Sequence, residues 1–234
     1  MNAIIQPSGL ARGGTLSGPP NRREVRLGRP GLDPAHGCLD VLIFDDSGSM
    51  SGGNDPVGNR YAEARRAVEV LGNATLTGRQ RIAVLHFDYP SIELSGQRRL
   101  DRKQDRRAVT DALQIPAGAW GSSALTPAMM AANKLARDSG IKDVRCTIFS
   151  DFELTDFNPR QPYDEIAKFP GPVHAVVLNA EPPAALQAQA NVTITRIEGA
   201  SPPGLVAAAL MHSLAATRRG AGLPRIRHTR PRSP

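Results

Sequence analysis

Three short segments of this chain carry carboxylate and hydroxyl side chains at spacings that suit metal binding. The first, DDSGS, places Asp45, Ser47 and Ser49 at alternate positions, so that their side chains can point the same way from a tight loop. The other two are the turn GSSAL at residues 121–125 and the pair SD at residues 150–151. Carboxylate and hydroxyl oxygens are hard ligands, which suit Mg²⁺ or Mn²⁺ rather than zinc or copper. Because such a set carries few charges, a bound ion would stay electrophilic and keep a position open for an incoming carboxylate.

Two of these segments directly follow apolar runs that are typical of buried strands. The run DVLIFD ends at Asp45, and the run VRCTIFSD ends at Asp151. Continuous apolar runs of this kind indicate strands that are buried on both faces. In open α/β sheets, ligands bind beyond the carboxyl ends of the strands. If the two strands are neighbours, Asp45 and Asp151 converge at one edge of the sheet together with several hydroxyl groups.

The chain between residues 38 and 217 alternates strand patterns with helix patterns. This alternation predicts a doubly wound α/β fold with a mostly parallel six-stranded sheet, one antiparallel edge strand and helices on both faces. One helix is expected to begin at Thr126, which suits the N-cap position before Pro127. The edge strand is expected to form a hairpin with the strand before it. The expected strands are Asp40–Asp45, Arg81–Asp88, Ser91–Leu94 (the edge strand), Val144–Asp151, Pro172–Asn179 and Asn191–Ile197, and the other helices are expected around residues 61–71, at Arg102–Leu113 and from Ser201 onward.

The basic charge of the chain lies mainly at its two ends. The whole chain has 234 residues and a net charge of +7, but residues 218–234 alone carry six arginines and no acid, and residues 1–37 carry five arginines against two acids. The central region, with 18 basic and 20 acidic residues, has a net charge of −2. Both ends are rich in Gly and Pro, which predicts disorder. We therefore expect a mostly disordered segment at 1–37, in which Glu24–Leu27 docks on the domain, one domain at 38–217, and a disordered basic tail at 218–234.

The composition also predicts a compartment. No apolar run approaches the ~20 residues of a membrane helix, and the first residues lack the pattern of a secretory signal. The two cysteines, Cys38 and Cys146, are too few for a disulfide framework or a zinc site by themselves. A cytoplasmic protein without a membrane partner is expected.

The three segments together resemble the metal-ion-dependent adhesion site (MIDAS) of von Willebrand factor type A (VWA) domains. Asp-x-Ser-x-Ser after a strand matches the family's first motif, and GSSALTPA from Gly121 is similar to its Gly-Gly-Thr-x-Leu-x-x-Ala segment, with Ser123 at the threonine position. IFSDFELTD resembles the family's strand that ends in Thr-Asp-Gly, which makes Asp151 the second acid. The motifs occur in the family's order, and the resemblance covers about Asp40–Ala216.

The resemblance implies a site and a function. The hydroxyls of Ser47, Ser49 and Ser123 would contact Mg²⁺ (or Mn²⁺), and Asp45 and Asp151 would do so directly or through water. Family members mostly bind proteins, whose acidic side chain completes the metal shell. Bacterial cytosolic members often work beside AAA+ ATPases or in stress-response and conflict operons. A non-enzymatic adaptor is therefore expected, whose partner is an AAA+ ATPase or another operon-encoded protein.

Two departures from the family pattern affect the site. Ser123 replaces threonine, which keeps the hydroxyl but frees its rotamer, so a lower metal affinity is expected. Phe152 replaces the glycine that usually follows the second acid, and a bulkier, more apolar rim beside the ion is expected.

Other interpretations remain open from the sequence alone. The DDSGS segment could be only a polar turn, and Thr126 could bind the ion in place of Ser123. A Mg²⁺-dependent phosphohydrolase of the haloacid dehalogenase kind also has an aspartate after a strand, but it needs a second aspartate where this chain has Ser47. The basic ends could bind nucleic acid, although no stacking aromatic residues accompany their arginines.

Overall fold

The computed structural model describes residues 23–50, 55, 59–87, 96–119, 121–199, 201–222 and 224–228. These residues form a six-stranded mixed sheet with the strand order β4-β3-β2-β5-β6-β7. Neighbouring strands are parallel except that β4 runs antiparallel to β3. The predicted sheet is thereby confirmed. The strands are β2 (Cys38–Phe44), β3 (Gln80–His86), β4 (Arg98–Arg99), β5 (Asp143–Ser150), β6 (Val173–Leu178) and β7 (Val192–Ile197).

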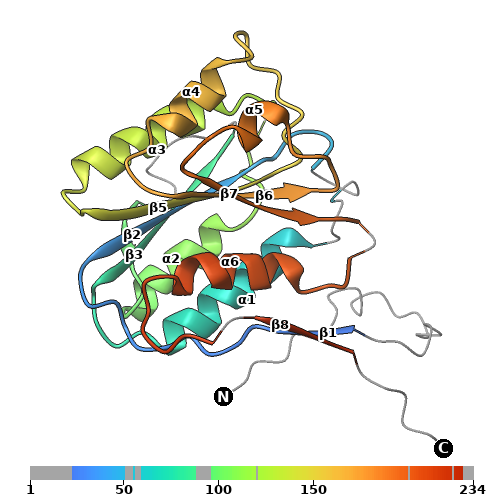
Figure 1. Cartoon of the computed structure of the whole chain (residues 1–234). Helices are drawn as coiled ribbons and strands as arrows, with labels where there is room; N and C mark the ends of the chain where they lie inside the picture. The colour runs from blue at the N-terminus through green and yellow to red at the C-terminus, as the bar shows by residue number, and fades with distance from the viewer. Residues whose placement is uncertain are drawn as a thin grey trace, which may run out of the picture.

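Helices cover both faces of the sheet, as predicted (Figure 1). One face packs against α1 (Arg60–Asn73), α2 (Lys103–Ala112) and α6 (Leu205–Ala215), and the other against α3 (Thr126–Asp138), α4 (Gln161–Ala167) and α5 (Ala184–Gln187). Each face has its own apolar cluster. All seven residues of β2 are buried, because this strand lies inside the sheet with helices above and below it.

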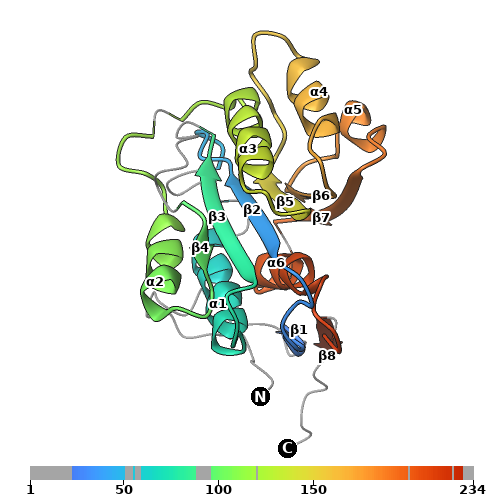
Figure 2. The same ribbon diagram turned by 90° about the vertical axis from the view of Figure 1, so that its left-hand side faces the viewer.

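The edge strand differs from the prediction. The expected strand at Ser91–Leu94 lies outside the described residues. The antiparallel edge strand that the structure describes is the short β4, which leads into α2 beside β3 (Figure 2). A two-residue edge strand exposes few unpaired backbone groups, which limits edge-to-edge pairing with other chains.

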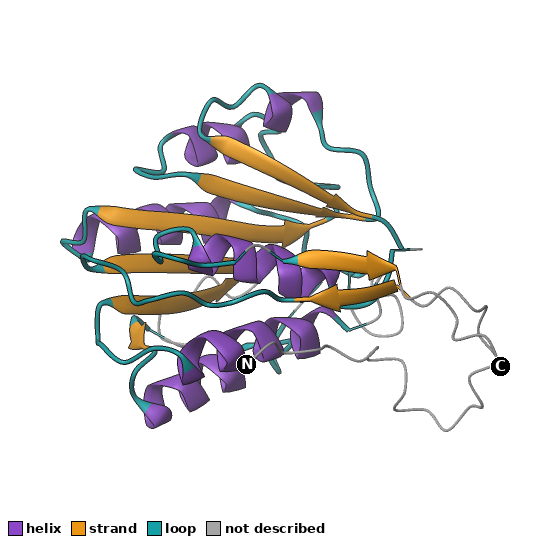
Figure 3. Ribbon diagram, turned by 60° about the horizontal axis from the view of Figure 1, so that its bottom comes forward, coloured by secondary structure: helices purple, strands orange, loops and turns teal. Residues whose placement is uncertain are grey.

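The two ends of the described chain form a small second sheet. Strand β1 (Arg23–Arg26) pairs antiparallel with β8 (Arg225–His228), and the pair lies beside α6, apart from the main sheet (Figure 3). Val25 and Leu27 are buried in the apolar cluster that contains α1 and α6. The expected docking of residues 24–27 agrees with this burial.

Structured residues extend beyond the predicted domain of residues 38–217 at both ends. Disorder was expected from residue 218 onward, but Arg218 is buried and residues 225–228 form β8. Residues 1–37 were expected to be mostly disordered apart from the docked segment Glu24–Leu27, but the structure describes the chain continuously from Arg23 to Met50. The physical reason is that a few buried contacts, rather than overall composition, hold these segments. Residues 1–22 and 229–234 lie outside the described part of the chain.

Candidate metal centre

The DDSGS segment and the pair Ser150–Asp151 meet because the strands before them, β2 and β5, are neighbours. Strands β2 and β5 pair in parallel with Phe44 opposite Phe149, so Asp45 and Ser150 follow side by side. The amide of Asp45 donates to the Phe149 carbonyl oxygen at 3.0 Å. The Ser150 hydroxyl donates to Asp45 Oδ2 at 2.6 Å. The sheet register therefore brings both predicted segments to one edge.

Four of the five predicted ligands are joined by short contacts. The amide of Ser47 donates to Asp45 Oδ1 at 2.9 Å, which closes the loop after β2. The hydroxyls of Ser47 and Ser49 lie 3.1 Å apart, and the Ser49 hydroxyl donates to Asp151 Oδ2 at 2.6 Å. These contacts connect residues about a hundred positions apart in the chain. They bring Ser47, Ser49 and Asp151 together, with the Asp45 carboxylate bonded to the Ser47 amide.

The fifth predicted ligand, Ser123, lies in an adjoining turn. Its carbonyl oxygen accepts a hydrogen bond from the Thr155 amide at 3.2 Å, in the loop that follows Asp151. A Cβ atom at Gly121 would lie 3.7 Å from the Gly48 amide nitrogen, so this turn also contacts the loop after β2. Among the interactions described for the ordered residues, the Ser123 hydroxyl has no hydrogen bond to the other four. The structure therefore places the turn but does not join the Ser123 side chain to the set.

Asp156 ties two of the loops together, a role that the sequence did not reveal. Its two carboxylate oxygens accept from the amides of Leu125 and Thr126 at 3.0 and 2.9 Å. Asp156 thus caps the N-terminus of α3 from a loop about thirty residues away. The helix dipole also favours a negatively charged carboxylate at this end of the helix. The predicted N-cap role of Thr126 is wrong: Thr126 is the first helical residue, and its buried hydroxyl oxygen has no hydrogen-bond partner among the residues that the structure describes.

Arg60 holds both ends of the DDSGS loop from the start of α1. Its guanidinium donates to the Asp45 carbonyl oxygen at 2.8 Å and also to the Met50 carbonyl oxygen. The same group forms an ion pair of 3.1 Å with Asp46, and both side chains are at most 1% exposed. Arg60 was not identified from the sequence, because nothing in its local pattern distinguishes it from a surface arginine of α1.

The Asp46 carboxylate is compensated by three side chains. Besides Arg60, His86 Nδ1 lies 2.6 Å from Asp46 Oδ2, and the Tyr61 hydroxyl donates to Asp46 Oδ1. The other ring nitrogen of His86 lies 3.0 Å from the Ala112 carbonyl oxygen. Both ring nitrogens of His86 are thus engaged with protein oxygens, so neither is available to bind a metal ion.

Asp45 and Asp151 form the negative side of the candidate centre. Burial raises the pKa of Asp45 to about 6, and the negative charge of Asp151 adds to this, although the hydrogen bonds from Ser150 and Ser47 oppose it. A divalent cation would compensate both carboxylates. Within the described residues, no three His, Cys, Asp or Glu side chains gather as a metal site. The donor set is instead two carboxylates and neighbouring hydroxyls, which fits a hard cation.

Comparison with known proteins identifies the fold. No protein-family model matches the chain, and no curated protein matches it. A solved structure described as von Willebrand factor type A from Catenulispora acidiphila matches with a TM-score of 0.60 and 18% identity, covering 84% of this chain and 49% of that chain. This chain has the VWA fold.

Other solved structures with the VWA fold agree. The pilus adhesin SpaC from Lactobacillus rhamnosus GG matches with a TM-score of 0.55 at 14% identity, over 83% of this chain and 31% of that one. Proximal thread matrix protein 1 from the mussel byssus, with a zinc-occupied MIDAS motif, matches with a TM-score of 0.53 at 14% identity, over 80% and 49%. This chain spans half or less of the length of each of these proteins.

Phe152 departs from the expectation for a VWA rim. Its side chain is only 4% exposed and packs in the apolar cluster of the face covered by α3 and α4, so it does not form an apolar rim. Its φ is 60°, a left-handed conformation that a bulky residue rarely adopts. Its amide donates to the Ser150 hydroxyl at 2.7 Å, next to Asp45 and Asp151. Phe152 therefore has a backbone conformation that glycine adopts readily, and its ring turns into the core.

This strain predicts an unusual order of stability for two variants. Phe152→Ala and Phe152→Gly both lose the buried ring, at a cost of about 3–5 kcal/mol. The glycine variant should be more stable than the alanine variant by about 1 kcal/mol, because only alanine keeps the left-handed strain. Urea denaturation measures both. Phe169 is equally buried without a positive φ, so there the order should reverse. Equal or higher stability of Phe152→Ala would contradict the strain argument.

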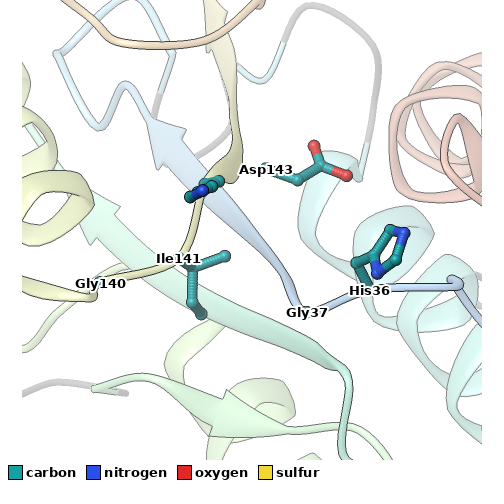
Figure 4. Close-up of a pocket in the computed structure, with 6 residues that line it drawn as sticks. His36, Gly37, Gly140, Ile141 and Asp143 are labelled. Atoms are coloured by element: carbon teal, nitrogen blue, oxygen red, sulfur yellow. The ribbon is translucent and has the colours of Figure 1, made fainter.

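A separate hollow lies at the opposite edge of the VWA sheet, where β2 and β5 begin. It has a volume of about 550 Å³, and Figure 4 shows His36, Ile141 and Asp143 around it. His36 and Lys142 are exposed, and Asp143 is half-exposed. Since its polar groups are solvated rather than buried and convergent, this hollow has less of the character of a binding site than the Asp45 edge.

Proposed function

We propose that this chain is a protein-binding VWA module that holds Mg²⁺ or Mn²⁺ at Asp45, Ser47, Ser49, Ser123 and Asp151. The observation that carries the proposal is the contact chain from Ser47 through Ser49 to Asp151, beside the buried Asp45. The partner would offer an acidic side chain to the ion. An AAA+ ATPase or another operon-encoded protein in the cytoplasm is the partner that we propose. Within the described part of the chain, no helix has the length and apolar character needed to cross a membrane.

The residues of the site support recruitment rather than turnover. A bound ion would offer an open coordination position, and its positive charge would attract an acidic side chain of the partner. Ser47 and Ser49 provide neutral oxygens, so the donor set carries only the two charges of Asp45 and Asp151 and leaves the ion attractive to a third carboxylate. A phosphohydrolase would need a general acid where Ser47 stands, and the neighbouring His86 is engaged on both nitrogens. We therefore propose a non-enzymatic function.

Calorimetric titration with Mg²⁺ and Mn²⁺ tests the metal site. We expect saturable binding to the wild type and its loss in Asp45→Asn and Asp151→Asn, because each variant removes one of the two charged ligands. Asp143→Asn is the matched control, since Asp143 begins β5 at the opposite edge of the sheet, and it should bind like the wild type. Urea denaturation of each variant verifies that it is folded. Absence of wild-type binding, or unchanged binding in both site variants, would contradict the proposal.

Enzymatic activity is measured on the same wild-type and variant proteins. With a generic phosphate ester and Mg²⁺ we expect no turnover. Metal-dependent turnover that Asp45→Asn abolishes would instead favour the phosphohydrolase interpretation.

A further inference from the structure

Phe157 is exposed to an unusual degree for a phenylalanine. Its relative exposure is 107%, which means that its ring makes almost no contact with the rest of the described molecule. Isolated exposed apolar residues are common, so exposure alone does not mark a binding surface. Among the described residues, five large hydrophobic side chains are exposed, and Phe157 is the aromatic one. The others are Leu32, Leu76, Ile115 and Met130.

The backbone on both sides of Phe157 is anchored. The preceding residue, Asp156, binds two amides at the N-terminus of α3 through its carboxylate. The following residue, Asn158, accepts from the Arg160 amide through its side chain at 3.1 Å and from the Gln161 amide through its carbonyl oxygen at 3.1 Å. These bonds hold the backbone on both sides of Phe157, and its ring lies in solvent.

The same loop forms part of the candidate metal centre. It begins at Asp151, and its Thr155 amide binds the Ser123 carbonyl oxygen. Its first phenylalanine, Phe152, is buried in the core, whereas Phe157 is fully exposed. Phe157 thus lies in the loop that follows Asp151, and a hydrogen bond from Thr155 connects this loop to the Ser123 turn. This is the edge of the sheet at which a partner's acidic side chain would approach the ion.

We propose that Phe157 is the apolar anchor of the partner-binding surface. The partner is a protein segment that presents a carboxylate to the ion and a large apolar side chain, a few residues away, to the Phe157 ring. This inference rests on the proposed function of the metal site. Aromatic residues dominate the binding energy of many interfaces, and a ring on an anchored loop loses little conformational freedom on binding. The apolar contact adds affinity and selects among acidic segments that the ion alone would bind alike.

A random peptide library displayed on phage tests the proposal without knowledge of the natural partner. The library is selected on immobilised full-length protein in Mg²⁺ and eluted with EDTA. Three proteins are compared: the wild type, Phe157→Ser, and Leu76→Ser as the matched control, because Leu76 is 86% exposed in the turn between α1 and β3. Selected peptides are then synthesised, and their affinities for the three proteins are measured, along with Mg²⁺ affinity by calorimetry.

We expect the wild-type and Leu76→Ser selections to share an acid and a large apolar residue at a constant spacing. These peptides should bind Phe157→Ser about tenfold more weakly or worse, with unchanged Mg²⁺ affinity, because a buried aromatic contact contributes at least that much. EDTA-eluted peptides that carry an acid but no apolar residue, and bind Phe157→Ser as tightly as the wild type, would overturn the role of Phe157 and leave the metal site supported. Failure to select any metal-dependent peptide on the wild type would overturn the proposed function itself, and this inference with it.

Discussion

Replacing Arg60 with methionine is expected to lower the free energy of unfolding by about 3–5 kcal/mol, because it leaves the buried Asp46 carboxylate without its closest arginine. The same change should weaken Mg²⁺ binding at the proposed site. Arg60 binds the carbonyl oxygens of Asp45 and Met50, so its removal frees both ends of the loop that carries Ser47 and Ser49. Urea denaturation and calorimetry on the same preparations measure the two effects.

Companion variants separate charge from geometry at Arg60. Arg60→Lys keeps the positive charge for Asp46 but lacks the planar fork that reaches two carbonyl groups, so it should recover part of the stability and little of the metal affinity. In the double variant with Asp46→Asn, the loss caused by Arg60→Met should shrink, because the buried charge of Asp46 that Arg60 compensates is no longer present. Arg66→Met, on the exposed side of α1, should change stability by no more than about 0.5 kcal/mol. A similarly small effect of Arg60→Met would show that Arg60 does not hold the loop.

Replacing Arg218 with methionine should cost a similar amount, about 3–5 kcal/mol. The Arg218 guanidinium is fully buried and pairs with Asp33 at 3.0 Å. It also donates to the carbonyl oxygens of Pro30 and Ala74 at 2.9 Å and to Gln80 Oε1 at 2.8 Å. One side chain thereby joins the N-terminal segment, the turn after α1 and the end of α6. The methionine variant would leave Asp33 and several carbonyl groups without this partner.

Arg219 provides the matched control for Arg218. It is the next residue in the chain and is exposed, so Arg219→Met should stay within about 0.5 kcal/mol of the wild type. A chain shortened to residues 38–217, the boundaries expected from composition, lacks Arg218, Asp33 and the buried Val25 and Leu27. We expect it to be less stable than Arg218→Met in urea denaturation. If the shortened chain were as stable as the wild type, residues 38–217 alone would form the stable domain, and the contacts of Arg218 would add nothing to it.

The fold and much of the candidate site could be predicted because their signals are local. The strand at Cys38–Phe44 reads as a continuous apolar run since both of its faces are buried, and the residues that follow it carry recognisable oxygen donors. Helix α2 was expected at Arg102–Leu113, and each of its observed ends lies within one residue of that range. The short helices α4 and α5 were not predicted, because four to seven residues provide too little periodic pattern.

The sequence alone predicted the six-stranded sheet, the four longer helices and the location of the basic charge, and it singled out Asp45, Ser47, Ser49, Ser123 and Asp151 as oxygen donors. The three-dimensional contacts were needed to find the distant supporting groups: Arg60 behind the loop after β2, and Asp156 rather than Thr126 at the start of α3. They were also needed to find that Arg218 is buried inside the domain. The physical reason is that hydrogen bonds and burial depend on proximity in space. Phe152 and Phe157 stand five residues apart in one loop, and nothing in their local sequence tells that the first is buried at a strained φ and the second fully exposed.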